Sequence, residues 1–177
     1  LVVVLVFLAQ NVVLAEDYIT DAVKALQNGS VYVFPGTEGT DQNTAAKLKE
    51  RLTSTDNIVL VILPASAEKE LEADALTIAS RLSEMLGNQR IIGLAVGKKV
   101  VGYAQVLPTG VADDQMKRAQ SVSNDTITTL GTFAQNIRLW QKENNLPVRP
   151  TLTPTPKPKP TPTPISPEEA QRRSFFW

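Results

Sequence analysis

The stretch that decides the fold is residues 57–104, NIVLVILPASAEKELEADALTIASRLSEMLGNQRIIGLAVGKKVVGYA. It opens with Ile58–Leu63, where every residue is apolar. A strand exposed on one face alternates between apolar and polar residues, so this unbroken run predicts a strand buried on both faces. Pro64 ends the strand because proline has no N–H for the hydrogen-bond ladder. We therefore expect the central strand of a covered sheet here.

The rest of this stretch predicts a helix followed by a hairpin. Over residues 66–86 the apolar residues recur every three or four positions, which is the period of one long amphipathic helix. Gly87 can adopt the left-handed conformation that closes a helix. Two more apolar runs, 91–96 and 99–104, flank a Gly97-Lys98 turn, and this pattern is typical of a β-hairpin.

Shorter segments precede this unit. Residues 17–27 predict a helix and residues 31–34 a strand. A second helix, at about 43–53, connects that strand to the central one. Strands joined by a helical crossover are most often parallel, so these two strands are expected to be parallel neighbours.

Two helices are predicted after the hairpin. A short one covers about residues 113–120, and a longer one runs to about residue 144 with Ser123 or Asn124 as its N-cap. The longer helix has an apolar face that is expected to pack on the sheet. The predicted fold class is therefore α/β, with a small mixed sheet of about four strands sandwiched by helices.

Composition excludes several kinds of function. The chain has 177 residues, 18 basic and 18 acidic side chains, and neither cysteine nor histidine. Balanced charge gives no general attraction to nucleic acid, so no nucleic-acid partner is expected. Without cysteine and histidine there are no disulfides, no Cys/His zinc site and no Ser–His or Cys–His catalytic pair. Any chemistry has to come from carboxylates, amines and hydroxyls.

The first segment predicts a membrane connection. Residues 1–15 are apolar except for Gln10 and Asn11, which indicates a signal peptide or an N-terminal membrane anchor. The alternative is a first core strand, because a short apolar run is also typical of a buried strand. The globular domain is then expected over residues 16–146.

The last segments predict a tether. Residues 147–167 hold nine of the twelve prolines, interleaved with threonine, which is typical of an extended stalk; a proline-rich ligand for an SH3-type module is the alternative. Residues 168–177 end with two arginines and then Phe175-Phe176-Trp177. Basic residues followed by aromatic ones are typical of the water side of a transmembrane helix. We interpret 168–177 as a juxtamembrane segment truncated before such a helix.

The domain resembles the TPM family, in the variant found in bacterial membrane-anchored proteins. The resemblance rests on Asp21–Leu26, Val31–Pro35, Val61–Ala65, Val100–Tyr103 and Asp113. It implies an α/β sandwich that is usually extracytoplasmic or lumenal and tethered by a transmembrane helix. Some members have been linked to divalent-cation binding and acid-phosphatase activity, and others to photosystem repair or respiratory-complex assembly.

The chain departs from this family at two positions where chemistry would lie. The turn before the third strand usually resembles Asp-Asn-Gly, whereas this chain has Asn88-Gln89-Arg90. A stretch with glycine and glutamate commonly follows the Gly-Tyr strand, whereas this chain has Ala104–Pro108, which contains neither.

The best candidate metal ligands are Asp113 and Asp114. A hard cation such as Ca²⁺, or another divalent cation, needs several converging oxygen ligands. Carbonyl groups of residues 108–110 and a carboxylate from Glu38 or Asp41 are the expected additional ligands. The alternative is that the two aspartates only occupy the first turn of a helix, where negative charge is favourable. The same alternatives apply to the four acidic residues at the start of the helix after the central strand, Glu68, Glu70, Glu72 and Asp74.

A ligand-binding rim follows from the predicted topology. Open α/β sheets bind ligands beyond the carboxyl ends of their parallel strands, so residues 35–41 and 64–68 are expected to share one rim. The first of these segments, Pro-Gly-Thr-Glu-Gly-Thr-Asp, has no Lys-Ser/Thr at the spacing of a phosphate loop. We interpret it as a plain loop at the place where a small ligand would bind.

The sequence as a whole favours a non-enzymatic module on the extracytoplasmic side of the cell membrane. Its terminal hydrophobic segments would contact the membrane, and its domain would bind a protein partner or assist assembly. The alternative is a metal-dependent acid phosphatase of the TPM type that uses Asp113 and Asp114. Calorimetry with divalent cations distinguishes the two.

Overall fold

A computed structural model gives the fold and describes residues 16–53 and 56–144. The predicted segments 1–15, 147–167 and 168–177 lie outside these residues. The fold class is confirmed: six helices flank a four-stranded mixed sheet within the described part of the chain. The strands are β1 (Val31–Val33), β2 (Ile58–Leu63), β3 (Ile91–Val96) and β4 (Lys99–Ala104).

The sheet has the strand order β1-β2-β3-β4. β1 and β2 are parallel, β2 and β3 are parallel, and β3 and β4 form the antiparallel hairpin. Every residue of β2 and β3 is buried, which confirms the prediction from the unbroken apolar run. The carboxyl ends of the three parallel strands therefore lie at one edge of the molecule.

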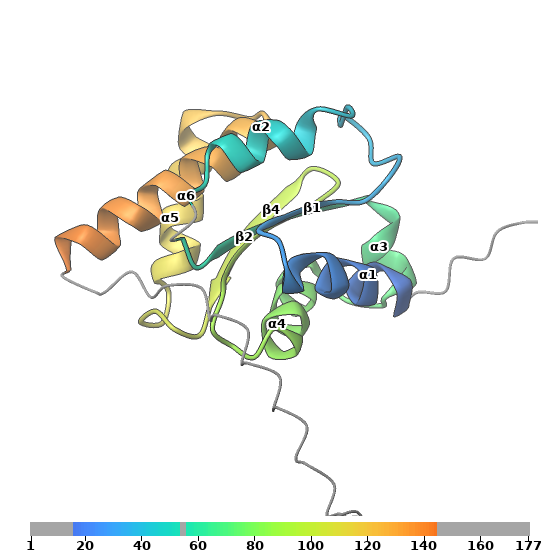
Figure 1. Cartoon of the computed structure of the whole chain (residues 1–177), viewed down its shortest axis with the longest axis horizontal. Coiled ribbons are helices and arrows are strands. Elements are labelled where there is room, and N and C mark those ends of the chain that lie inside the picture. Colours follow the sequence, from blue (N-terminus) through green and yellow to red (C-terminus); the bar gives the residue numbers. More distant parts are fainter. Residues whose placement is uncertain (1–15, 54–55, 145–177) are drawn as a thin grey trace, which may run out of the picture.

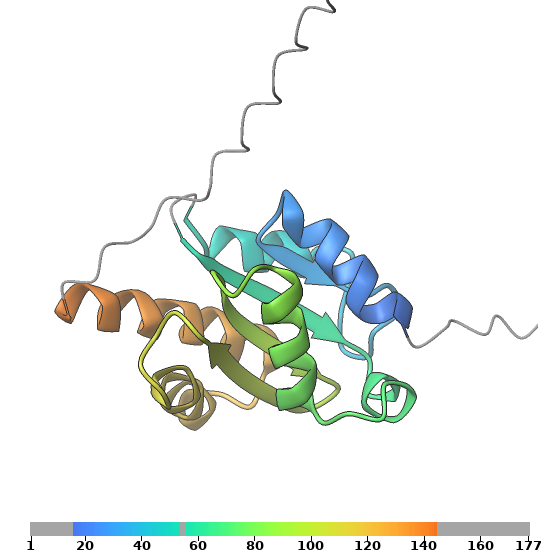
Figure 2. The ribbon, with the colours of Figure 1, turned by 90° about the horizontal axis from the view of Figure 1, so that it is seen from below.

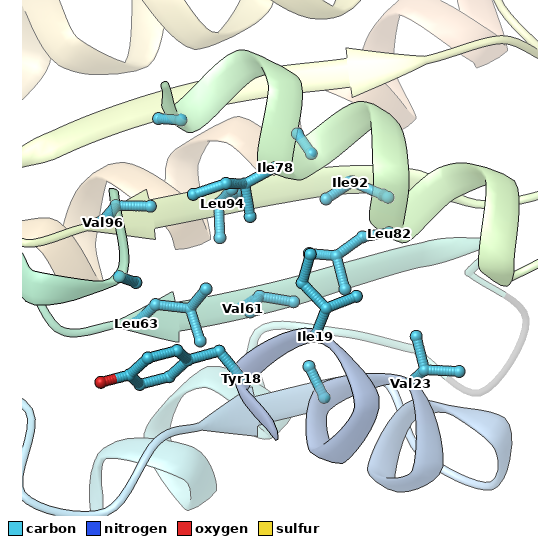
Figure 3. Close-up of a cluster of buried hydrophobic side chains, with 14 of the residues drawn as sticks. Tyr18, Ile19, Val23, Val61, Leu63, Ile78, Leu82, Ile92, Leu94 and Val96 are labelled. Carbon is cyan, nitrogen blue, oxygen red and sulfur yellow. The ribbon is translucent and has the colours of Figure 1, made fainter. Parts of the chain in front are cut away.

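Helices cover both faces of the sheet (Figures 1 and 2). Alternate residues of each central strand point to opposite faces, which gives two separate cores. One core joins the sheet to α1 (Glu16–Gln27), α3 (Ser66–Glu70) and α4 (Ala75–Met85), and Figure 3 shows its side chains. The other core joins it to α2 (Thr44–Glu50), α5 (Val111–Val122) and α6 (Thr126–Glu143).

The prediction of one helix over residues 66–86 is wrong. The chain forms α3, then breaks at Glu72, whose φ of 48° lies in the left-handed region. Asp74 begins α4 as its N-cap, and its side chain accepts a hydrogen bond from the Thr77 N–H at 2.7 Å. Leu71, the C-cap of α3, still packs against the core that contains α1. The apolar period of the sequence therefore continues across the break.

Smaller boundary predictions also need correction. The first strand ends at Val33, and the helix expected over 43–53 covers only Thr44–Glu50. The N-cap of the long helix is Asp125, in place of Ser123 or Asn124, because the Asp125 carboxylate accepts a hydrogen bond from the Thr128 N–H at 2.8 Å. The predicted apolar face of this helix does pack against the sheet.

Candidate functional site

A cleft of about 700 Å³ lies beyond the carboxyl ends of the parallel strands. Its walls come from the loop after β1, the turn after β3 and the first turn of α6. The lining residues are Glu38, Gly39, Thr40, Ile62, Gly97, Lys98, Asn124, Asp125, Thr126 and Ile127. This is the position at which open α/β sheets bind ligands.

The loop wall is held by a chain of hydroxyl hydrogen bonds. Thr37 donates its hydroxyl to the Phe34 carbonyl, and Thr40 donates to the Thr37 carbonyl, each at 2.7 Å. At its far end Asp41 accepts from the Thr44 hydroxyl at 2.9 Å and from Lys47 Nζ at 2.9 Å. These bonds lower the pKa of Asp41 below its ordinary value, the bond from Lys47 first. The loop is therefore built with a defined shape before any ligand arrives.

The turn wall depends on one glycine. Gly97 has a φ of 57°, and a Cβ there would lie 2.8 Å from the Ala65 Cβ, so this position requires glycine. The Gly97 N–H donates to the Leu63 carbonyl at 3.0 Å, which fixes the turn to the end of β2. Lys98, which is exposed, follows and brings an ammonium group to the mouth of the cleft.

The helix wall is the first turn of α6. Asp125 caps it, and the hydrogen bonds from Thr128 lower the pKa of the Asp125 carboxyl. The Thr129 hydroxyl donates to the Ser123 carbonyl at 2.9 Å, so the turn before the helix is also fixed. A carboxylate at this position matches the partial positive charge of a helix N-terminus.

The lining of the cleft combines polar and apolar residues. Glu38, Thr40, Lys98, Asn124, Asp125 and Thr126 are polar or charged, whereas Ile62 and Ile127 are apolar. Such a combination binds through a few oriented hydrogen bonds above a hydrophobic contact. The arrangement is therefore suited to recognition of a ligand or segment with both polar and apolar groups.

The sequence predicted part of this rim. Glu38, Gly39 and Thr40 belong to the predicted 35–41 segment and line the cleft. The 64–68 segment does not line the cleft, although Ala65 of this segment packs closely against Gly97. The turn at Gly97-Lys98 was missed because the parallel pairing of β2 with β3, which places it at this edge, was not predicted. The start of α6 was missed because only tertiary packing brings it there.

Asp113 and Asp114 lie in the first turn of α5 and do not line the cleft. Asp113 forms an ion pair with Lys117 at 2.5 Å, one helical turn later, and this contact raises the pKa of Lys117. Asp41, the expected additional ligand, is paired with Lys47. Within residues 16–53 and 56–144 no group of three or more acidic side chains converges as a metal site would. In this part of the chain, the two aspartates therefore have no third acidic side chain beside them to complete the set of oxygen ligands that a hard cation needs.

Three of the four acidic residues after the central strand have structural roles, and one of them, Asp74, is the N-cap of α4. Glu68 accepts a hydrogen bond from the Ala75 N–H at 3.0 Å and pairs with Lys99 Nζ at 2.6 Å. It therefore ties α3 to the start of α4 and to β4. Glu70 accepts a hydrogen bond from the Tyr18 hydroxyl at 3.1 Å, which connects α3 to α1.

Comparisons with protein-family models, with curated proteins and with solved structures found no match for this chain. Among the helices of the described residues, none combines the length and the apolar character that a membrane crossing requires.

Proposed function

We propose that this chain is a non-catalytic binding or assembly module of the TPM type, and that it binds its partner in the cleft at the carboxyl ends of the parallel strands. The observation that carries the proposal is the construction of this cleft. Three separate chain segments meet there, and two of them are fixed by hydrogen bonds between side chains and backbone. A preformed site loses little conformational entropy when a partner binds.

The bonding of the carboxylates supports binding over catalysis. Asp41 is held by Lys47 and Thr44, Asp125 by Thr128, and Asp113 by Lys117. A general acid or base needs a pKa near the working pH, whereas the pKa values of Asp41 and Asp125 are lowered. These carboxylates maintain the shape of the domain.

The membrane part of the proposal rests on the sequence alone. Residues 1–15 would be a signal peptide or anchor, 147–167 a stalk, and 168–177 a juxtamembrane segment, with the domain on the extracytoplasmic side. Protease added to intact cells is the test. The domain should be cleaved from outside, and full protection until the cells are lysed would contradict this location.

Site-specific photo-cross-linking tests the cleft. A photoreactive phenylalanine derivative would replace Lys98 at the cleft mouth in the full chain in its native membrane. Replacement of Lys142, an exposed lysine at the end of α6, is the matched control. We expect a discrete adduct from position 98 that weakens when Glu38→Lys is added. Identical adducts from both positions, or none from position 98, would refute binding in the cleft.

Calorimetry tests the catalytic alternative. The full chain would be titrated with Ca²⁺, Mg²⁺ and Mn²⁺ and then assayed with a phosphomonoester. We expect neither stoichiometric heat nor turnover. Stoichiometric binding that Asp113→Asn abolishes, together with hydrolysis, would replace the binding module with a metal-dependent phosphatase.

A further inference from the structure

The outer edge of β1 has backbone groups that the sheet does not use. Leu60 donates its N–H to the Ser30 carbonyl and Phe34 donates to the Ile62 carbonyl, both at 2.9 Å, and Tyr32 is in register with Val61. In a parallel pair, alternate residues bond to the neighbouring strand. Residues 30, 32 and 34 therefore face β2, and the N–H and C=O groups of Val31 and Val33 point away from the sheet.

The two edges of the sheet differ. At the β4 edge, Gln120 of α5 donates its side-chain amide to the Val100 carbonyl at 2.9 Å. Gly102 in the middle of β4 is buried, and α5 packs closely on the sheet face beside it, since a Cβ there would lie 2.4 Å from the Ala112 carbonyl oxygen. Helix α5 thus lies beside β4, and its Gln120 occupies one outward carbonyl of that edge. No backbone hydrogen bond from another described residue reaches the outward groups of Val31 or Val33. Val33 is partly buried, and Val31 is 7% exposed because its side chain packs in the core with α2.

A shallow hollow of about 720 Å³ runs beside this edge. It is lined by Asp21, Lys24 and Ala25 of α1 and by Tyr32, Val33, Phe34 and Pro35. Figure 1 shows β1 between α2 on one face of the sheet and α1 on the other. If another strand paired with β1, its side chains on the α1 face could occupy this hollow. A strand edge with unpaired N–H and C=O groups can form hydrogen bonds with a strand of another chain.

We propose that β1 pairs antiparallel with β1 of a second copy of this chain, so that two four-stranded sheets become one sheet of eight strands. The register follows from the outward groups. Val31 lies opposite the partner's Val33, and Val33 opposite the partner's Val31, and each pair exchanges two hydrogen bonds. The two-fold axis then passes between Tyr32 and the partner's Tyr32. This central pair has no hydrogen bonds, so the aromatic rings come close as a cross-strand pair.

Charge on α1 supports a second copy as the occupant. Asp21 and Lys24 lie one turn apart on the helix wall of the hollow, where they form an ion pair at 3.4 Å, and their side chains remain 51% and 69% exposed. In the proposed dimer a two-fold axis reverses the direction of the neighbouring α1, so the exposed Asp21 and Lys24 could exchange their intrahelical pair for pairs with the partner's Lys24 and the partner's Asp21. The same surface is thus complementary to itself in backbone register, in aromatic pairing and in charge.

Disulfide trapping tests the register. The chain contains no cysteine, so any cross-link comes from the introduced residue alone. Tyr32→Cys in the full chain, held in detergent micelles and mildly oxidised, should give a disulfide-linked dimer, because facing residues of a pair without hydrogen bonds have their Cβ atoms about 5 Å apart. Tyr103→Cys in β4 is the matched control at the other edge. Equal linkage in both variants, or none at position 32, would overturn the proposal.

Charge reversal at two exposed residues of α1 tests whether the partner is a second copy. Lys24→Glu places like charges across the axis and should at least halve the cross-linked fraction of Tyr32→Cys. Mixing Tyr32→Cys chains that carry Lys24→Glu with Tyr32→Cys chains that carry Asp21→Lys places opposite charges across the axis while neither chain keeps the intrahelical pair, and this mixture should restore linkage. Lys142→Glu changes the net charge equally at a distant site and should have no effect. Linkage that does not recover in the mixture would show that the two α1 helices do not meet.

Discussion

Gly93 and Gly102 face each other across β3 and β4, and the ring of Phe133 lies on both. A Cβ on Gly93 would lie 3.0 Å from the ring, and one on Gly102 would lie 2.9 Å from it. The absence of two side chains lets a large aromatic ring of α6 reach the sheet. These glycines therefore set the distance between helix and sheet.

Gly102→Ala should destabilise the domain strongly. Its Cβ would lie 2.4 Å from the backbone oxygen of Ala112, and backbone cannot turn aside as a side chain can. We expect a loss of about 3 kcal/mol in the free energy of unfolding, at the upper end of overpacking effects. Urea denaturation measures it. Gly131→Ala is the control, because its Cβ would meet only the flexible Arg51 side chain at 3.2 Å and alanine favours a helix; a similar loss there would contradict the packing argument.

Asp125→Ala should weaken the first turn of α6. The variant loses the hydrogen bond from the Thr128 N–H, and loss of such a cap costs about 1 kcal/mol. Asp125→Asn keeps an acceptor oxygen and should lose much less. Thermal unfolding of both variants distinguishes the cap from the charge, since equal losses would mean that the charge alone matters.

Acid should destabilise the domain through its lowered carboxyl pKa values. The pKa values of Asp41, Asp74 and Asp125 all lie below their ordinary values. Each group then stabilises the fold above its unfolded pKa of about 3.9, and this stability disappears as pH falls through the folded value. The urea midpoint should therefore drop below about pH 4. The Asp74→Asn variant caps α4 with a side chain that does not titrate, so its urea midpoint should fall less steeply with decreasing pH. A slope equal to that of the unaltered chain would contradict the role of Asp74.

Helices and strands could be predicted from the sequence where one local signal was enough. The apolar run of β2, the Gly97-Lys98 turn and the face of α6 each depend on nearby residues. The break between α3 and α4 was missed because the apolar period passes through it without interruption. Asp74 with Thr77 is a capping signal that marks the start of α4, but the periodicity concealed it.

Glu68 should hold this break together. Glu68→Ala removes both the acceptor for the Ala75 N–H and the pair with Lys99, whereas Glu68→Gln keeps an acceptor and loses only the pair. Exposed ion pairs contribute little, so the glutamine variant should lose under about 1 kcal/mol and the alanine variant more. Hydrogen exchange at the Ala75 amide should accelerate in the alanine variant only. Acceleration in both would assign the role to the charge.

The position of the candidate cleft could be predicted from the sequence, but most of the residues that line it could not. Parallel strands imply a rim at their carboxyl ends, and residues 38–40 lie there as expected. The other walls come from a hairpin turn and from a helix more than 60 residues further along the chain than β2. No spacing in the sequence indicates that the first turn of α6 lies against that turn. The two aspartates at 113 and 114 stay predicted ligands, and the structure adds that the first of them pairs with Lys117.

Both cores share β2, so the domain should unfold as one unit. Leu60 belongs to the core under α6 and Leu63 to the core under α1, and both are fully buried. Leu60→Ala and Leu63→Ala should each cost about 2–5 kcal/mol. Calorimetry should show one lowered transition in each variant. Two separate transitions in either variant would mean that the cores are independent.

The contact of Phe133 with the paired glycines has a consequence for inheritance. The helix that carries this ring also forms a wall of the cleft with its first turn. If Phe133 were replaced by a smaller side chain during evolution, α6 would move closer to the sheet and the cleft would become narrower. The choice of partner would then change through a buried residue that does not contact the partner.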